Sequence, residues 1–168
     1  MRDQFIAPSY SFQRPANTTQ YAENELIANS ATAASVLPMR WNTDGIGGSG
    51  KIVAVRVFTD NEAVTAAVYN VHIFKSDPGV PTNGDNGAYA VASVRDLLAT
   101  VVCDLSSGAT ASTTDKMERI ALTVPIVFQL PPDTPTGVSL YGFISTGTAG
   151  TYTPASAELF EVTLEIEG

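Results

Sequence analysis

Apolar and polar residues alternate with a period of two in several short segments of the chain. In LFEVTLEIE near the end, every second residue from Phe160 to Ile166 is apolar, and in IVAVRVFT the apolar series runs through Val53, Val55 and Val57. Successive side chains of a β-strand point to opposite faces, so this pattern predicts strands with one buried and one solvated face. The predicted strands are Glu25–Ala28, Ile52–Thr59, Ala67–Phe74, Leu97–Cys103, Ile120–Phe128, Val138–Ser145 and Glu158–Ile166.

The segments between these strands are rich in turn-forming residues. SDPGVPTNGDNG, LPPDTPTG and STGTAGTYTPAS hold many of the 13 glycines and 10 prolines. Only YAVASVRDLLAT also fits a helix, and no internal repeat or heptad is visible. Several short strands joined by turns predict an all-β fold, an antiparallel β-sandwich of the jelly-roll type.

The first twenty residues have no clear period and hold Pro8 and Pro15, which favour an extended backbone. We therefore predict an extended N-terminal arm at residues 1–20 and a single β-sandwich domain at residues 21–168. Exposed apolar side chains on an arm favour docking onto a partner. The candidate partner-binding residues are Arg2, Phe5, Ile6, Tyr10, Phe12 and Arg14. An alternative with nearly equal weight is that the arm closes the domain's own sheet as an edge strand.

The chain of 168 residues is poor in charge and acidic. Apolar residues make up 44% and charged residues 15%, and the formal net charge is −8. Nucleic-acid backbones and anionic membranes both attract clustered Lys and Arg, so neither partner is expected. The single cysteine, Cys103, cannot form a disulfide within the chain. The start MRDQFIAPSY lacks the apolar run of a signal peptide, so we expect synthesis and folding in a cytoplasm.

The segment GIGGSGKI, residues 45–52, imitates the phosphate-binding loop of nucleotide hydrolases. Such a loop follows a buried strand, opens a helix and carries Ser or Thr after its lysine. Here Ile52 follows Lys51, and a strand is predicted next. The apolar segment LLATVVCD ends in an acidic residue, as the metal-binding strand of such enzymes does. An apolar strand that ends in an acidic turn residue is nevertheless common in β proteins. We interpret the glycine run as a flexible connection.

Other catalytic or metal-binding patterns are equally weak. His72, the only histidine, lies on a predicted strand, where a hydrogen-bonded structural role is expected, and Cys103 ends an apolar strand as a small hydrophobe. The loop with Asp77, Asn83, Asp85 and Asn86 could hold calcium, but these residues also suit turns. We expect no enzyme, no metal and no cofactor, although sequence alone does not exclude a glycosidase that uses paired acids.

Several segments resemble a known family. They are RPANTTQYAENELIANS (14–30), GGSGKIVAVRVF (47–58), YNVHIFKSDPGVPTNGDNGAYAV (69–91) and YTPASAELFEVTLEIEG (152–168). Together they resemble small virion structural proteins of tailed bacteriophages, and the group is similar to the cement, or head decoration, proteins that form jelly rolls on the capsid exterior.

The resemblance implies a capsid decoration protein that is made in the host bacterial cytoplasm and assembled on the outside of the virion head. Its implied partners are the major capsid protein and neighbouring copies of itself, as a dimer or trimer. It would stabilise contacts between capsid subunits by burying apolar area at many repeated sites. The alternative is a carbohydrate-binding or tail and receptor-binding sandwich of the virion, with Trp41, Tyr89, Tyr141 and Tyr152 as stacking platforms.

Overall fold

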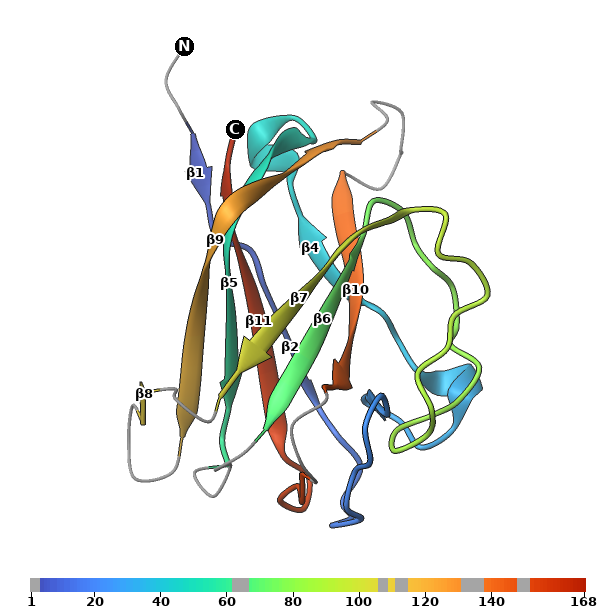
Figure 1. Cartoon of the computed structure of the whole chain (residues 1–168). Coiled ribbons are helices and arrows are strands. Elements are labelled where there is room, and N and C mark those ends of the chain that lie inside the picture. The colour runs from blue at the N-terminus through green and yellow to red at the C-terminus, as the bar shows by residue number, and fades with distance from the viewer. Residues whose placement is uncertain (1–3, 62–66, 106–108, 111–114, 131–137, 148–151) are drawn as a thin grey trace.

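The chain folds into two antiparallel β-sheets packed face to face, as Figure 1 shows for a computed structural model that describes residues 4–61, 67–105, 109–110, 115–130, 138–147 and 152–168. The antiparallel β-sandwich predicted from the sequence is confirmed. The strands are β1 (Phe5–Ile6), β2 (Ser9–Gln13), β3 (Leu26–Ile27), β4 (Met39–Asn42), β5 (Ser49–Thr59), β6 (Val68–Phe74), β7 (Leu97–Asp104), β8 (Ala109–Thr110), β9 (Lys116–Gln129), β10 (Ser139–Thr146) and β11 (Leu159–Glu167).

Within the described residues, six strands form one sheet and five form the other. The first has the order β1-β11-β5-β9-β8, with β2 also paired to β11, and the second has the order β3-β10-β6-β7, with β4 also paired to β10. The chain crosses between the sheets repeatedly from β4 to β11, as in a jelly roll. At one side of the sandwich the edge strand β7 approaches β9 (Figure 1).

Each strand predicted from alternation is present, with ends shifted by a few residues. The helix considered for YAVASVRDLLAT is wrong, because residues 89–96 form no helix and β7 begins at Leu97. The sequence did not predict β4, which starts directly after Pro38. That strand pairs only with β10 in the described structure, so the proline precedes an edge strand, where it is tolerated.

The main hydrophobic core fills the space between the sheets. Trp41 of β4 is fully buried there, and its indole Nε1 donates to the carbonyl of Val162, at 2.8 Å. Val55 and Val71, from facing sheets, are also fully buried. A second apolar cluster lies on the other face of the five-stranded sheet, where residues of the loop between β6 and β7 pack over it; its buried members are Leu26, Ala28, Val36, Phe74 and Phe143.

A bulge in β5 interrupts the alternation predicted from the sequence. Val53 has no partner in the register with β9 or in that with β11, and it is only partly buried. Ile52 takes its place and is fully buried, while Val55 and Val57 face the core as predicted. One extra residue in a strand shifts the faces that follow it, so a strict period of two fails at that point.

The outer face of β11 is less solvated than its alternating pattern predicts. The side chain of Glu165 is only 8% exposed, because Arg56 of β5 and Arg119 of β9 lie over it. Arg119 donates to both carboxylate oxygens, at 2.9 and 2.5 Å, and the Arg56 Nε lies 3.0 Å from one of them. These hydrogen bonds and charges lower the pKa of Glu165.

Candidate functional site

The N-terminal arm forms part of the domain's own sheet. Phe5 and Ile6 of β1 pair with the end of β11, and β2 pairs with β11 from Leu159 to Thr163. This arrangement is the edge-strand alternative weighed from the sequence. Of the candidate contact residues, Phe5 remains 57% exposed, Ile6, Tyr10 and Phe12 pack partly against the core, and Arg2 lies outside the described residues.

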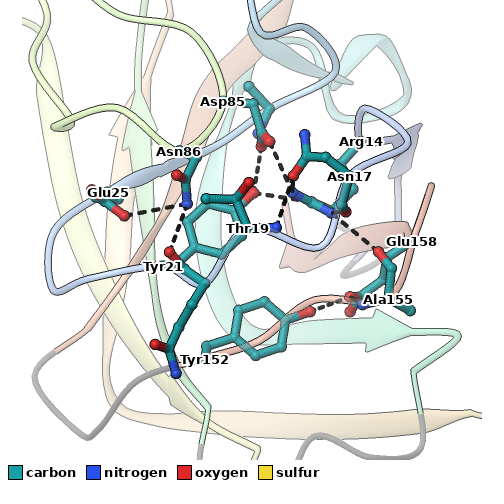
Figure 2. Close-up of polar contacts among 12 residues, drawn as sticks. Arg14, Asn17, Thr19, Tyr21, Glu25, Asp85, Asn86, Tyr152, Ala155 and Glu158 are labelled. Atoms are coloured by element: carbon teal, nitrogen blue, oxygen red, sulfur yellow. Dashed lines mark hydrogen bonds and ion pairs between the residues drawn. The ribbon is translucent and has the colours of Figure 1, made fainter.

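Arg14 is buried and fully engaged inside the molecule (Figure 2). Its guanidinium donates to the Tyr21 hydroxyl at 3.0 Å, to the Asp85 carboxylate at 3.0 Å, and to the backbone carbonyls of Asn17 at 2.7 Å and Ala155 at 3.1 Å. The side chains of Arg14 and Asp85 are both 0% exposed. This contact joins the arm to the loop between β6 and β7, and it removes Arg14 from the residues able to meet a partner.

The loop considered for calcium uses its polar groups within the fold. Asp85 also accepts hydrogen bonds from the Tyr21 hydroxyl, at 2.5 Å, and from the Ala28 amide, at 3.0 Å. Asn86 donates to the carbonyl of Gln20 and, as Figure 2 shows, to the Glu25 carboxylate, while the Asp77 carboxylate caps a turn by accepting from the Gly79 amide. Among the described residues, no group of three or more His, Cys, Asp or Glu side chains is placed to hold a metal ion.

Glu158 is a second buried acid. Its carboxylate accepts hydrogen bonds from Thr59, from Asn61 and from the backbone amide of Ala155. It also accepts one from the Tyr152 hydroxyl, as Figure 2 shows. Burial raises the pKa of Glu158. A buried carboxyl with a raised pKa is one mark of a catalytic acid. Both oxygens of Glu158 are already occupied by donors of the fold, so the arrangement fixes the turn that leads into β11.

His72 and Cys103, which were considered as a base and a nucleophile, are also held inside the structure. The His72 ring bonds the Thr100 and Ser145 hydroxyls, at 3.0 and 2.9 Å, and stacks on Tyr89, with ring centroids 4.1 Å apart. Burial lowers its pKa to about 4, so the ring is neutral at pH 7. Burial likewise raises the pKa of Cys103 to about 12. His72 is thus hydrogen-bonded on its strand and Cys103 is buried, which are the environments expected from the sequence.

The glycine run before β5 differs from a phosphate-binding loop. Residues Asp44–Ile46 form a single 3-10 turn, Gly47 and Gly48 have φ of 65° and 77°, and Ser49 already begins β5. The Lys51 Nζ lies 2.8 Å from the Glu167 carboxylate on the neighbouring strand. The chain therefore continues as a strand where a nucleotide site needs a helix N-terminus.

Two of the four aromatic residues considered as stacking platforms for sugars are buried. Trp41 is 0% exposed and Tyr152 is 6% exposed, so neither can stack on an external ligand. Tyr89 is already stacked on His72, and the Arg40 guanidinium lies 6.0 Å from the ring centre of Tyr141. The carbohydrate-binding hypothesis loses two of its four aromatic residues to the core.

The most exposed large apolar side chains of the described structure belong to β9. Val124 is 79% exposed and Val127 is 76% exposed. In the register between β5 and β9, Ile52 pairs with Ile126 and Ala54 with Ala121, so residues Leu122–Pro125 of β9 stand opposite Val53 alone. We call Leu122–Pro125 the β9 bulge.

The β9 bulge is held at its base and exposed at its tip. Leu122 and Ile126 pack partly against the core, whereas Thr123, Val124 and Pro125 are exposed. From Ile120 to Leu130 the sequence has no charged residue, in a protein of net charge −8. Bulges re-aim side chains, and exposed apolar groups favour contact with another molecule. The β9 bulge and Val127 form the candidate binding surface.

A shallow cleft of about 550 Å³ lies beside this surface. Its lining includes Lys51, Val127, Gln129 and Glu167, so an ion pair stands next to the exposed valine. Sequence reasoning missed the whole surface, because alternation does not reveal a bulge. The uncharged run from Ile120 to Leu130 was the one visible indication.

Comparisons with known proteins found similar chains only among solved structures, with low identity. No family model and no curated protein matches the chain. A carbohydrate-binding module of a glycoside hydrolase family 9 enzyme, Cel9A of Ruminococcus flavefaciens, is 16% identical, with a TM-score of 0.36 over 96% of this chain and 99% of that one. The BFDV capsid protein in a 60-mer is 12% identical, with a TM-score of 0.34 over 99% of this chain and 93% of that one. The turnip yellow mosaic virus structure is 13% identical, with a TM-score of 0.31 over 99% of this chain and 93% of that one.

Within the described residues no helix is long and apolar enough to cross a membrane.

Proposed function

We propose that this chain is a capsid decoration protein of a tailed bacteriophage, which binds the outside of the head and stabilises contacts between major capsid protein subunits. The sequence resemblance to virion structural proteins supports the class of protein. The observation that carries the proposal is the β9 bulge with Val127, which holds the two most exposed large apolar side chains of the described residues. Its proposed partner is an apolar depression between capsid subunits.

The projection suits repeated adhesion. Exposing Val124 and Val127 to water has no benefit for the isolated domain, whereas burying each in a partner contributes about 1.5–3 kcal/mol before the cost of association. Many copies on a symmetric shell add such modest contacts together. The stretch from Ile120 to Leu130 has no charged residue, which avoids the cost of desolvating its own ions at the contact.

Binding to capsids that lack the protein tests this function. Purified Val124→Asp protein is mixed with such capsids and sedimented, and the bound fraction is compared with wild type. Val80→Asp is the matched control, because Val80 is 50% exposed and lies in the loop between β6 and β7, away from β9. We expect Val124→Asp to lose at least about tenfold in affinity, with an unchanged thermal midpoint, and Val80→Asp to bind normally. Equal binding by both variants would refute the β9 contact, and no binding by wild type would refute the decoration role.

A further inference from the structure

The outer face of the six-stranded sheet carries two arginines in directly opposite positions. Arg56 of β5 pairs with Arg119 of β9 in the register of the two strands. Like charges that lie directly opposite on neighbouring strands destabilise a sheet. Among the described residues, the carboxylate of Glu165 is the only one that forms an ion pair with either guanidinium. Two positive charges thus meet one negative charge, in a protein whose net charge is −8.

Glu165 uses only part of the donor capacity of these two arginines. Arg119 donates to it through Nε and Nη2, at 2.9 and 2.5 Å. The buried Nε of Arg56 lies 3.0 Å from Glu165 without the alignment of a hydrogen bond. Within the described part of the chain, neither Nη1 of Arg119 nor the two Nη atoms of Arg56 donate a hydrogen bond. A guanidinium has five N–H donors, so several remain for another molecule.

The remaining donors are accessible and held in place. The side chain of Arg56 is 37% exposed and that of Arg119 is 48% exposed, whereas Glu165, which they cover, is 8% exposed. Ala54 of β5 stands between Glu165 and Ala121 in the register, and its small side chain leaves room for Arg119 to reach Glu165. Side chains that are already ordered lose less entropy when they bind a ligand.

Charge favours a single carboxylate as the ligand of this arginine pair. The planar guanidinium of an arginine can donate two parallel hydrogen bonds to one carboxylate. One carboxylate also neutralises the one unpaired positive charge, whereas the net charge of −8 disfavours a polyanion such as nucleic acid. Glu161 lies on the same face of β11 as Glu165 and forms no ion pair with either arginine within the described structure, so its charge further disfavours a highly charged ligand.

The arginine pair adjoins the candidate binding surface. Arg119 lies on β9 shortly before the β9 bulge. Val127, on the other side of the bulge, lies in the same cross-strand row as Glu167, which shares one face of β11 with Glu165. The exposed valine and the two arginines therefore lie on the same side of the six-stranded sheet, where one partner can contact both.

We propose that Arg56 and Arg119 bind the carboxylate of an aspartate or glutamate side chain of the major capsid protein. This inference rests on the proposed decoration function and names the chemistry of the partner at that contact. The β9 bulge supplies apolar burial, while the arginine pair selects a junction that presents an acidic side chain and fixes the orientation of the bound copy.

Sedimentation with capsids at several salt concentrations tests the arginine pair. We expect Arg56→Gln and Arg119→Gln each to lose about tenfold or more in affinity at low salt and to depend less on salt than wild type. Arg56→Lys should keep the salt dependence and only part of the affinity, because lysine lacks the planar pair of donors. Lys75→Gln is the matched control, since it removes an exposed positive charge from the loop between β6 and β7, and it should bind as wild type does.

Titration of the wild-type full chain with sodium acetate is a second test, which needs no capsid. In NMR spectra, the Nε–Hε signals of Arg56 and Arg119 should shift more with acetate than with sodium chloride at equal ionic strength, and that of Arg95 should not. Shifts no larger with acetate than with chloride would overturn the site. Larger shifts with sodium phosphate than with acetate would overturn the choice of a carboxylate.

The outcomes separate this inference from the proposed function. Wild-type binding to capsids that neither Arg56→Gln nor Arg119→Gln weakens overturns the arginine contact and leaves the decoration role intact. Absence of wild-type binding refutes the decoration role, and the acetate titration then decides on the carboxylate site alone. Loss of binding by both glutamine variants, with unchanged thermal midpoints, supports the inference.

Discussion

Replacing Asp85 by alanine should strongly destabilise the protein without changing any residue of the candidate binding surface on β9. The Asp85 carboxylate accepts from the Arg14 guanidinium, the Tyr21 hydroxyl and the Ala28 amide, and its side chain is 0% exposed. Without it, a buried guanidinium loses its counter-ion and two further donors lose their acceptor.

Breaking a buried ion pair by removing one partner costs about 3–5 kcal/mol. The total stability of a domain is about 5–15 kcal/mol, so the variant keeps only part of it. For a chain of this size, 1 kcal/mol shifts the melting temperature by about 2–4 °C, which gives an expected fall of about 6–20 °C.

Thermal and urea unfolding of wild type, Asp85→Ala, Arg14→Met and the double variant measure this effect. Each single change should cost more than about 3 kcal/mol, and the double variant should cost clearly less than their sum, because the second change removes an already orphaned charge. Tyr152→Phe is a useful comparison, since it removes a hydroxyl from the separate Glu158 cluster. Single changes that cost under about 1 kcal/mol, or that add without coupling, would refute the argument that this pair joins the arm to the domain.

Further predictions concern the core, the histidine and the arm. Val55→Asp should unfold the domain or make it insoluble, because Val55 is fully buried. Arg56→Ala, on the opposite face of β5, should lower the free energy of unfolding by under about 1 kcal/mol in urea. Similar losses of stability in the two variants would contradict the register of β5. The pKa of His72 is lowered to about 4, so between about pH 6.5 and pH 4 the unfolded chain binds more protons than the folded one. The free energy of unfolding therefore falls as the pH falls, by up to about 1.4 kcal/mol per pH unit. His72→Gln should reduce this slope, and an unchanged slope would refute the role of His72 in the pH dependence. Deleting residues 1–13 should remove cooperative unfolding, because β1 and β2 cover one edge of β11; a stable truncated domain would favour a docking arm instead.

Alternation was sufficient to predict the main strands and the sandwich, because each strand buries one face against the opposite sheet. It failed where the backbone departs from a regular ladder. The bulge at Val53 moves Ile52 into the core, and the β9 bulge re-aims Val124 outward, yet both segments read as ordinary apolar runs. The sequence around Leu97 combined helix and strand tendencies, and pairing with β6 decided between them.

Buried polar residues were harder still to foresee. Arg14 was expected to contact a partner, because it flanks the apolar residues of the arm and could pair with acidic groups. Its partner Asp85 is 71 residues away in the sequence, and nothing local to either residue indicates the pair. Alternation placed Glu165 on the solvated face of its strand, although arginines from two other strands cover it. Contacts over such separations depend on the topology, which local periodicity does not supply.

Cryo-electron microscopy of capsids to which the purified protein has been added back tests the central claim most directly. The account predicts ordered density on the outside of the head at symmetry-related positions, with the β9 bulge facing a junction between capsid subunits. Bare capsids, density confined to the tail, or a bound domain whose β9 bulge faces solvent would contradict it.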